Sequence, residues 1–236
     1  MAKRLIELKR ECLERNLDLQ RLGLVFFTFG NVSVFEPDKA MFAIKPSGVP
    51  YKEMKPSDIV IVDLDCKVIS GKLRPSSDTP THAVLYKNFK GITSIVHTHS
   101  TYATAWAQSI KDVPVLGTTH ADHLAFPIPC TEIMPDTMIQ QNYELSTGLH
   151  IVETFKNRGL NPEEIEMVLV ASHGPFTWGK TSEKAVYNSK VLEEICKMAF
   201  LTLSINPEIL PLKDTLIKKH YERKHGKNSY YGQKKD

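Results

Sequence analysis

The sequence predicts an α/β fold in which helices cover a mixed, mostly antiparallel sheet. Short runs rich in β-branched and aromatic residues come mostly early in the chain and in hairpin-like pairs. Amphipathic segments of helical length lie between these runs and dominate the C-terminal half. A regular alternation of one strand and one helix would indicate a parallel sheet, and the sequence does not have this pattern.

The first part of the chain is expected to form one helix followed by two pairs of strands. Apolar residues recur at helical spacing over 3–17, which predicts an amphipathic helix. The runs 24–35 and 41–45 predict two strands joined at a Pro-Asp turn. The runs 59–62 and 67–70 predict a second hairpin.

Helices and strands are interspersed in the rest of the chain. The expected helices are 79–89, 102–109, 136–157, 182–204 and 212–224, and the expected strands are 94–99 and 167–172. The first of these helices starts at Thr79-Pro80, where a hydroxyl cap and a proline in the first turn are typical of a helix start. Gly174-Pro175 is expected to form a turn at the mouth of the last strand.

Composition and length predict a single globular domain over 1–236. The 236 residues are 42% hydrophobic and 24% charged, which disfavours disordered and fibrous proteins. No internal repeat, low-complexity tract or Pro/Gly/Ser linker divides the sequence.

The cysteines and the N-terminus indicate a cytoplasmic protein. Cys12, Cys66, Cys130 and Cys196 are scattered without a C-x-x-C pair, which disfavours a disulfide scaffold and a thiolate zinc site. The first residues carry charges throughout, so no signal peptide is expected. No stretch reaches the ~20 apolar residues of a membrane span, so no membrane partner is expected.

The charge distribution is uneven along the chain. The net charge of +3 is too small to indicate a nucleic-acid partner, and no basic face with interleaved aromatic residues is evident. The segment 213–236, however, has eight Lys or Arg against three Asp or Glu. This basic tail is either an anion-binding element or a solvated helix end.

Three histidines are candidate metal ligands. His97 and His99 lie two residues apart at the end of an apolar run, and residues two apart on a strand face the same side. They could bind one cation, or form a hydrogen-bonded pair near the surface. His173 follows another apolar strand and could complete a three-nitrogen site of the kind that catalytic zinc uses.

The remaining histidines compete for this assignment, because sequence spacing does not bring His173 to His97. These rivals are His82, His120, His123, His150, His220 and His225. His82 and His150 fall in predicted helices, where packed or solvated side chains are expected.

Two turns are candidate anion sites. Lys45-Pro46-Ser47-Gly48 follows a strand, offers a cation, and has a glycine that allows close backbone approach to a ligand. Ser76-Ser77-Asp78 stands directly before a helix, where an N-terminus attracts phosphate. Ordinary helix capping is the alternative role for these serines. Neither a P-loop nor G-x-G-x-x-G occurs, so no nucleotide or NAD cofactor is expected.

Seven ordered motifs carry a resemblance to a known family. They are Gly30-Asn31-Val32-Ser33, Lys45-Pro46-Ser47-Gly48, Ser76-Ser77-Asp78-Thr79-Pro80-Thr81-His82, His97-Thr98-His99-Ser100, Thr118-Thr119-His120-Ala121-Asp122, Ser172-His173-Gly174-Pro175-Phe176, and Lys224-His225-Gly226 with Tyr230-Tyr231-Gly232-Gln233. Together, over nearly the whole chain, they resemble the class II aldolase/epimerase superfamily, and most closely its pentulose-phosphate 4-epimerases.

The resemblance implies a three-layer α/β/α domain around a mostly antiparallel sheet, assembled as a homotetramer. It implies Zn²⁺ bound by His97, His99 and His173, with Asp78 next to the metal or a ligand of it. Three imidazoles also accept other divalent metals. The implied substrate-binding residues are Gly30, Asn31, Ser47, Gly48, Ser76 and Ser77. Lys45, in the same turn as Ser47 and Gly48, is assigned with them.

The implied reaction interconverts L-ribulose 5-phosphate and D-xylulose 5-phosphate, in arabinose or ascorbate breakdown. The C4 hydrogen of such a 2-ketose is not acidic, so simple proton abstraction cannot invert C4. Transient oxidation would need a nicotinamide site, which the sequence lacks, and the remaining route breaks and re-forms the C3–C4 bond, with a metal stabilising the enediolate. Asp122 and Tyr231 are implied as the acid/base pair, contributed at least partly by a neighbouring subunit. Without the resemblance, Asp122 would be assigned as a helix cap and Tyr231 to a disordered tail.

Two other functions are compatible with the same motifs. A class II sugar-phosphate aldolase would release its fragments, but in the aldolases of this superfamily a glutamate takes the position of Asp78. A noncatalytic module like the adducin head shares the fold, but would be expected to lack metal histidines. Both comparisons favour the epimerase.

Overall fold

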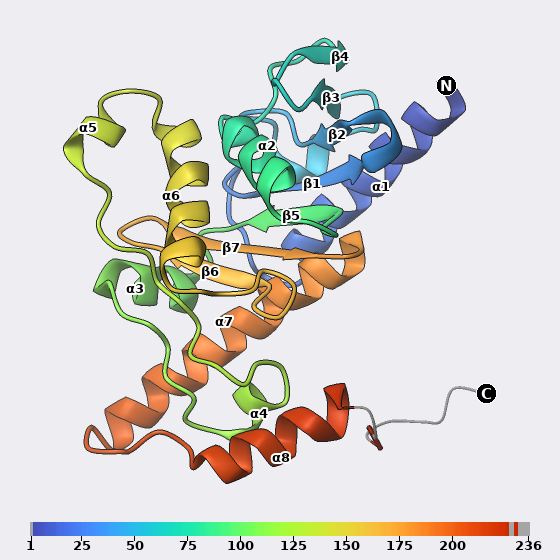
Figure 1. Ribbon diagram of the computed structural model, residues 1–236. Helices are drawn as coiled ribbons and strands as arrows, with labels where there is room; N and C mark the ends of the chain where they lie inside the picture. The colour runs from blue at the N-terminus through green and yellow to red at the C-terminus, as the bar shows by residue number, and fades with distance from the viewer. Residues whose placement is uncertain (1, 227–228, 231–236) are drawn as a thin grey trace.

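The computed structural model describes residues 2–226 and 229–230, and a seven-stranded sheet lies at its centre (Figure 1). In chain order the strands are β1 (Asn31–Glu36), β2 (Met41–Ile44), β3 (Val60–Asp63), β4 (Val68–Ser70), β5 (Ser94–His97), β6 (Met167–Val170) and β7 (Gly174–Gly179). Their order across the sheet is β4-β3-β2-β1-β5-β7-β6. Every neighbouring pair is antiparallel. Among the described residues, parallel pairing is limited to an isolated bridge between Cys130 and Leu169.

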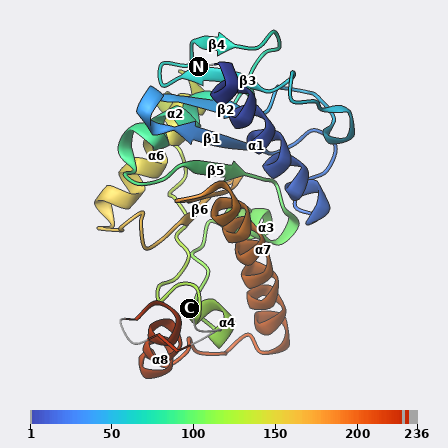
Figure 2. The same ribbon diagram turned by 90° about the vertical axis from the view of Figure 1, so that its right-hand side faces the viewer.

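Helices cover both faces of this sheet. Figure 2 shows α1 (Ala2–Arg21) and α7 (Ser182–Ile205) on one side of the strands, and α2 (Thr79–Asn88) and α6 (Tyr143–Asn157) on the other. The predicted three-layer α/β/α architecture is therefore confirmed. The remaining helices are α3 (Thr101–Ser109), α4 (Thr118–Ala121), α5 (Asp136–Ile139) and α8 (Asp214–His225), with 3-10 turns at Pro37–Lys39 and Tyr51–Glu53.

The period-two pattern of β1 explains this layering. Val32 and Val34 belong to clusters that pack against α1 and α7. Ser33 and Phe35 alternate with them and meet Tyr86 of α2 instead, with the rings of Phe35 and Tyr86 stacked at 4.6 Å between centroids. Burying each large apolar side chain in such a cluster contributes about 1.5–3 kcal/mol.

The helices that flank the later site are held closely. A Cβ added at Gly148 of α6 would lie 2.8 Å from Cβ of Val84, so glycine lets α6 pack directly on α2. The first turn of α3 is fixed from α7, because the carboxylate of Glu193 accepts hydrogen bonds from the backbone amides of Tyr102 and Ala103 at 3.0 and 2.9 Å. These amides have no partner within their own helix.

The helix α8 and the short helix α4 lie beyond the sheet, beside the C-terminal half of α7 (Figures 1 and 2). The long α7 reaches past the last strand, and the segment that follows it is tied back by a hydrogen bond from the amide of Leu212 to the carbonyl of Val115. No helix in the described part of the chain has the length and apolar character needed to cross a bilayer.

Two sequence predictions gave elements that are too long. The strand expected over 24–35 starts only at Asn31, because Phe27 and Gly30 have φ of +52° and +77°, which no extended strand allows. The single helix expected over 136–157 is divided into α5 and α6. Asn142 caps the second of them, its side-chain oxygen accepting a hydrogen bond from the amide of Leu145.

Two predictions near the histidines were also wrong. Gly174-Pro175 is not a turn but the start of β7, and the turn comes at residues 171–173. The strand expected over 94–99 ends at His97. His99 therefore does not share a strand face with His97 and is placed by the connection to α3.

Candidate active site

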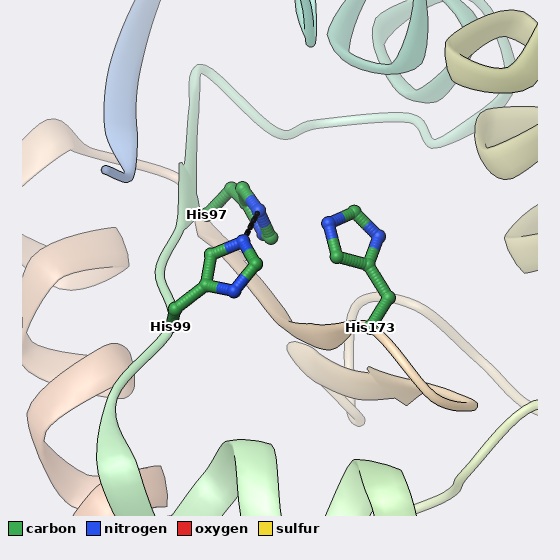
Figure 3. A group of neighbouring side chains, drawn as sticks. All are labelled: His97, His99 and His173. Atoms are coloured by element: carbon green, nitrogen blue, oxygen red, sulfur yellow. Dashed lines mark hydrogen bonds between the residues drawn. The ribbon is translucent and has the colours of Figure 1, made fainter. Parts of the chain in front are cut away.

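Three histidines meet at one end of the sheet, two of them at or just after the end of β5 and one between β6 and β7. His97 is the last residue of β5, His99 follows two residues later, and His173 lies in the turn between β6 and β7. Each offers a ring nitrogen, and these atoms all lie within 4.8 Å of one another. Figure 3 shows the three rings facing a common point. The predicted convergence of His173 on His97 and His99 is therefore present.

The backbone before His173 is strained. Ser172 has φ +59°, in the left-handed region that costs a non-glycine residue of order 1–3 kcal/mol. Gly174, directly after the histidine, allows the turn to approach the other connection, since a Cβ there would lie 2.9 Å from the carbonyl oxygen of Thr98. The left-handed backbone of Ser172 and the absence of a side chain at Gly174 thus together allow His173 to lie close to the other two histidines.

The donor set fits a divalent metal. Nδ1 of His97 donates a hydrogen bond to the carbonyl of Pro175 at 3.0 Å, which leaves Nε2 with its lone pair toward the centre. Nε2 of His99 lies 3.1 Å from Nε2 of His97. Two imidazole nitrogens on one tetrahedral zinc lie about 3.3 Å apart, given bonds of about 2.0–2.1 Å.

Burial favours the neutral, metal-binding form of His99 and His173. Desolvation, followed by the charge of the neighbouring His97, lowers the pKa of His99 below its ordinary value and that of His173 to about 3. His97 itself is buried, and its ring stacks on Phe176 with the centroids 4.2 Å apart. Neutral imidazoles are the ligands that zinc and related metals require.

Asp78 lies beside the histidines but is not one of the three clustered ligands. Its Oδ2 accepts a hydrogen bond from Nδ2 of Asn31 at 2.6 Å, and the same amide group donates to Oγ of Ser76 at 3.1 Å. Burial would raise the pKa of Asp78, but the nearby His97 and His82, with the bond from Asn31, outweigh it and lower that pKa. The carboxylate is thus held as an anion in the same cavity wall as the three histidines.

The predicted binding residues line one cavity of about 350 Å³ together with the histidines. The predicted residues in its wall are Gly30, Asn31, Lys45, Ser47, Gly48, Ser76, Ser77, Asp78, His97, His99 and His173. Neither Ser76 nor Ser77 is the N-cap of α2, which is Asp78 and makes no side-chain cap bond, but Oγ of Ser76 does accept a hydrogen bond from the amide of Asp78 at 3.3 Å. The expected hydroxyl cap at Thr79 is also absent, because this hydroxyl donates to the carbonyl of Ser76.

Both predicted glycines of this wall have positive φ. Gly30 has φ +77°, and a Cβ there would lie 2.9 Å from the carbonyl oxygen of His97. Gly48 has φ +70° with no atom within 4 Å of such a Cβ, so its side of the cavity is open for a ligand. Glycine adopts this conformation without the penalty that other residues incur.

Lys45 is a buried cation without a carboxylate partner among the described residues. Its Nζ donates to the carbonyl of Thr28 at 3.1 Å and lies 4.9 Å above the ring of Tyr51. Burial lowers the pKa of Lys45 to about 8. An anionic ligand in the cavity would supply the missing negative charge.

This lysine leads to a pH prediction. A pKa lowered to about 8 means that Lys45 carries its charge below this pH and loses it above. We expect kcat/KM for a sugar phosphate to fall as the pH rises through about 8, because kcat/KM reports the ionisation of the free enzyme. The Lys45→Arg variant keeps its charge above pH 12 and should lose this fall. A flat wild-type profile up to pH 9 would contradict the assignment.

Asp122 does not line the cavity that holds His97, His99 and His173 of its own chain. It follows α4. Its carboxylate instead accepts hydrogen bonds from Nδ1 of His220 and Nε of Arg223, both at 2.9 Å, with Nζ of Lys224 at 3.8 Å. Burial opposes ionisation, but the bonds from Arg223 and His220 outweigh it and lower the pKa of Asp122.

The basic tail is therefore partly explained as the partner of Asp122. α8 supplies His220, Arg223 and Lys224 to this carboxylate, so the helix is docked against the residue that follows α4. The other predicted catalytic residue, Tyr231, lies outside the described residues. Among the rival histidines, His82 bonds to the hydroxyl of Ser33 and His150 to the carbonyl of Glu132, and both are packed side chains as expected.

Sequence reasoning missed four residues of the cavity wall: Thr28 and Phe29, directly before Gly30, and Tyr143 and Glu144. Tyr143 and Glu144 lie in the first turn of α6, and the hydroxyl of Tyr143 lies 3.2 Å from Nδ1 of His173. The only local signal was Asn142, a typical N-cap, which marks a helix start but not its position against the histidines.

Comparison with known proteins relates the chain to one family. Residues 10–200 match the family model described as "Class II Aldolase and Adducin N-terminal domain". The chain is 48% identical over 228 residues to "L-ribulose-5-phosphate 4-epimerase UlaF" of Salmonella paratyphi B, covering 97% of this chain and 99% of that protein. The protein of the same name from Salmonella paratyphi C is 49% identical over the same shares.

A solved structure extends the relation to the fold. The structure named "L-fuculose 1-phosphate aldolase" superposes with a TM-score of 0.77 at 26% identity, covering 92% of this chain and 95% of that one. The family match, the relatives and this fold agree with the arrangement of motifs and histidines described above. The chain belongs to the class II aldolase and adducin N-terminal domain family.

Proposed function

We propose that the protein is a metal-dependent epimerase that interconverts L-ribulose 5-phosphate and D-xylulose 5-phosphate. The observation that carries this proposal is the convergence of three imidazoles with a wall rich in polar and cationic groups in one cavity. The relatives named L-ribulose-5-phosphate 4-epimerase, at nearly half identity over almost the full chain, support the choice of substrate.

The cavity wall would bind the sugar phosphate through complementary groups. Lys45 offers an unpaired positive charge, and the hydroxyls of Ser76 and Ser77 offer donors at the turn before α2. The side-chain oxygen of Asn31 is buried without a partner among the described residues, so it can accept a hydrogen bond from a sugar hydroxyl. These contacts would hold the phosphate end while the rest of the sugar reorients.

His97, His99 and His173 would hold the metal, with Zn²⁺ as the proposed ion. A divalent cation bound there supplies Lewis-acid stabilisation of negative charge on the sugar oxygens when the C3–C4 bond breaks. Asp78 lines the same cavity and adds a negative charge to it. Three ligands leave room for substrate, as in catalytic sites generally.

Asp122 and Tyr231 are proposed as the two proton-transfer groups, acting in the site of a neighbouring subunit. Inversion at C4 moves the oxygen from one side to the other, so a group is needed on each side. Asp122 does not line the histidine cavity of its own chain, and a neighbouring copy would supply it in the proposed homotetramer. Exposed apolar residues near this end, Ile205 and Leu210, support an interface between copies.

A cytoplasmic location is proposed because the four cysteines are unpaired.

A coupled assay tests the proposed function. Purified protein supplied with L-ribulose 5-phosphate should form D-xylulose 5-phosphate, and a chelator should stop the reaction until Zn²⁺ is restored. Release of dihydroxyacetone and glycolaldehyde phosphate as the main products would establish an aldolase instead. Absence of both reactions in zinc-loaded protein would indicate a noncatalytic module.

A further inference from the structure

Tyr143 contacts a metal ligand from a part of the chain with no motif of its own. Its hydroxyl lies 3.2 Å from Nδ1 of His173. This nitrogen is on the side of the His173 ring away from the other two histidines (Figure 3). The rings of Tyr143 and His173 are tilted by 45° with their centroids 5.8 Å apart. The phenol therefore meets the imidazole through its hydroxyl at the ring edge.

The ring nitrogens of His97 and His173 have different outer partners. Nδ1 of His97 is oriented by a backbone carbonyl, which can only accept and so fixes the proton on Nδ1. Nδ1 of His173 has a side-chain hydroxyl instead, which can accept or donate. Only the tautomer with the proton on Nδ1 leaves the Nε2 lone pair of His173 facing the other rings.

The first turn of α6 is well placed to hold this hydroxyl. The hydroxyl of Thr81 in α2 donates to the carbonyl of Glu144 at 2.5 Å, and Gly148 lets the two helices touch. The side chain of Asn142 caps the same turn. Tyr143 is thus anchored to α2, which begins at the turn of Ser76 and Asp78, and it links that wall to the β6–β7 turn.

We propose that Tyr143 is a positioning residue of the metal centre, and that its hydroxyl accepts a hydrogen bond from Nδ1–H of His173 and keeps Nε2 directed at the metal. This rests on the proposed function only in requiring a metal at the three histidines. Outer partners of metal-bound histidines raise the basicity of the ligand and fix its orientation, and their loss typically weakens metal binding 10–100-fold.

The test compares Zn²⁺ affinity in two tyrosine variants, measured on metal-free protein by competition with a chromophoric chelator. Tyr143→Phe removes the hydroxyl and keeps the ring, and its Kd for Zn²⁺ should rise about 10–100-fold. Tyr102→Phe is the matched control. Tyr102 lies three residues after His99, and its hydroxyl makes no hydrogen bond with another described residue. Its Kd should equal that of the wild type.

Two further readouts separate positioning from other roles. Saturating Zn²⁺ should restore most of the turnover of Tyr143→Phe, and ¹⁵N spectra of His173 in the wild type should place the proton on Nδ1. An unchanged Kd in Tyr143→Phe, or a proton on Nε2 of His173 in the wild type, would overturn the proposal while leaving the proposed function standing. Wild-type protein that binds no Zn²⁺ would overturn both.

Discussion

Replacing His97 with asparagine is expected to abolish metal binding and epimerisation together. The shorter amide cannot bring a nitrogen to the position of Nε2, which lies 3.1 Å from that of His99. Metal stabilisation of charge in the transition state is worth several kcal/mol, and about 4 kcal/mol corresponds to a loss of about a thousandfold in rate. Metal content by atomic spectroscopy and turnover in the coupled assay measure the two effects.

His150→Asn serves as the control for this variant. His150 is also buried, but it is hydrogen-bonded to the carbonyl of Glu132 and does not belong to the three-histidine cluster. We expect it to lose some stability and to keep its metal. A His97→Asn protein with full metal content and wild-type turnover would show that the cation, if present, binds elsewhere.

Replacing Asp122 with asparagine is expected to lower turnover by about 10²–10⁴-fold, which is the usual contribution of a positioned acid or base. The change keeps the size of the side chain and removes only the ionisable oxygen. His220 and Arg223 can still bond to the amide oxygen, so α8 should remain docked. Metal content should stay that of the wild type, because Asp122 is not in the cluster of His97, His99 and His173 and does not line their cavity.

The chain offers a matched control in Asp112, which pairs with Arg158 through its carboxylate as Asp122 does with Arg223. Asp112→Asn disrupts a similar ion pair outside the cavity and should leave turnover intact. If Asp122→Asn turned over like the wild type, Asp122 would have no part in proton transfer. Equal losses in both variants would point to a general effect of breaking an Asp–Arg pair.

Much of the sheet follows from local sequence pattern. The hairpins β1–β2 and β3–β4 come from short runs rich in β-branched and aromatic residues with turn residues between them. β7 was missed because Gly174 and Pro175 are typical of turns, whereas here they begin a strand paired to β5 and β6. That strand has no alternation to detect, since all its residues are buried.

The candidate site was predictable in its residues and not in its geometry. The sequence motifs identified the three histidines and the two candidate anion-binding turns. The pairing of β7 with β5 is what brings His173 close to His97. Tyr143 reaches His173 through the packing of α6 on α2, a tertiary contact that no local pattern encodes. The position of Asp122 against α8 depends likewise on how α8 packs on α4, far along the chain.

The most direct test of the account is X-ray diffraction at the zinc absorption edge from crystals of the zinc-loaded protein. One anomalous peak per chain should lie within bonding distance, about 2.0–2.1 Å, of ring nitrogens of His97, His99 and His173. A peak at another place, or a ring of His173 turned away from the other two in zinc-loaded crystals, would contradict it.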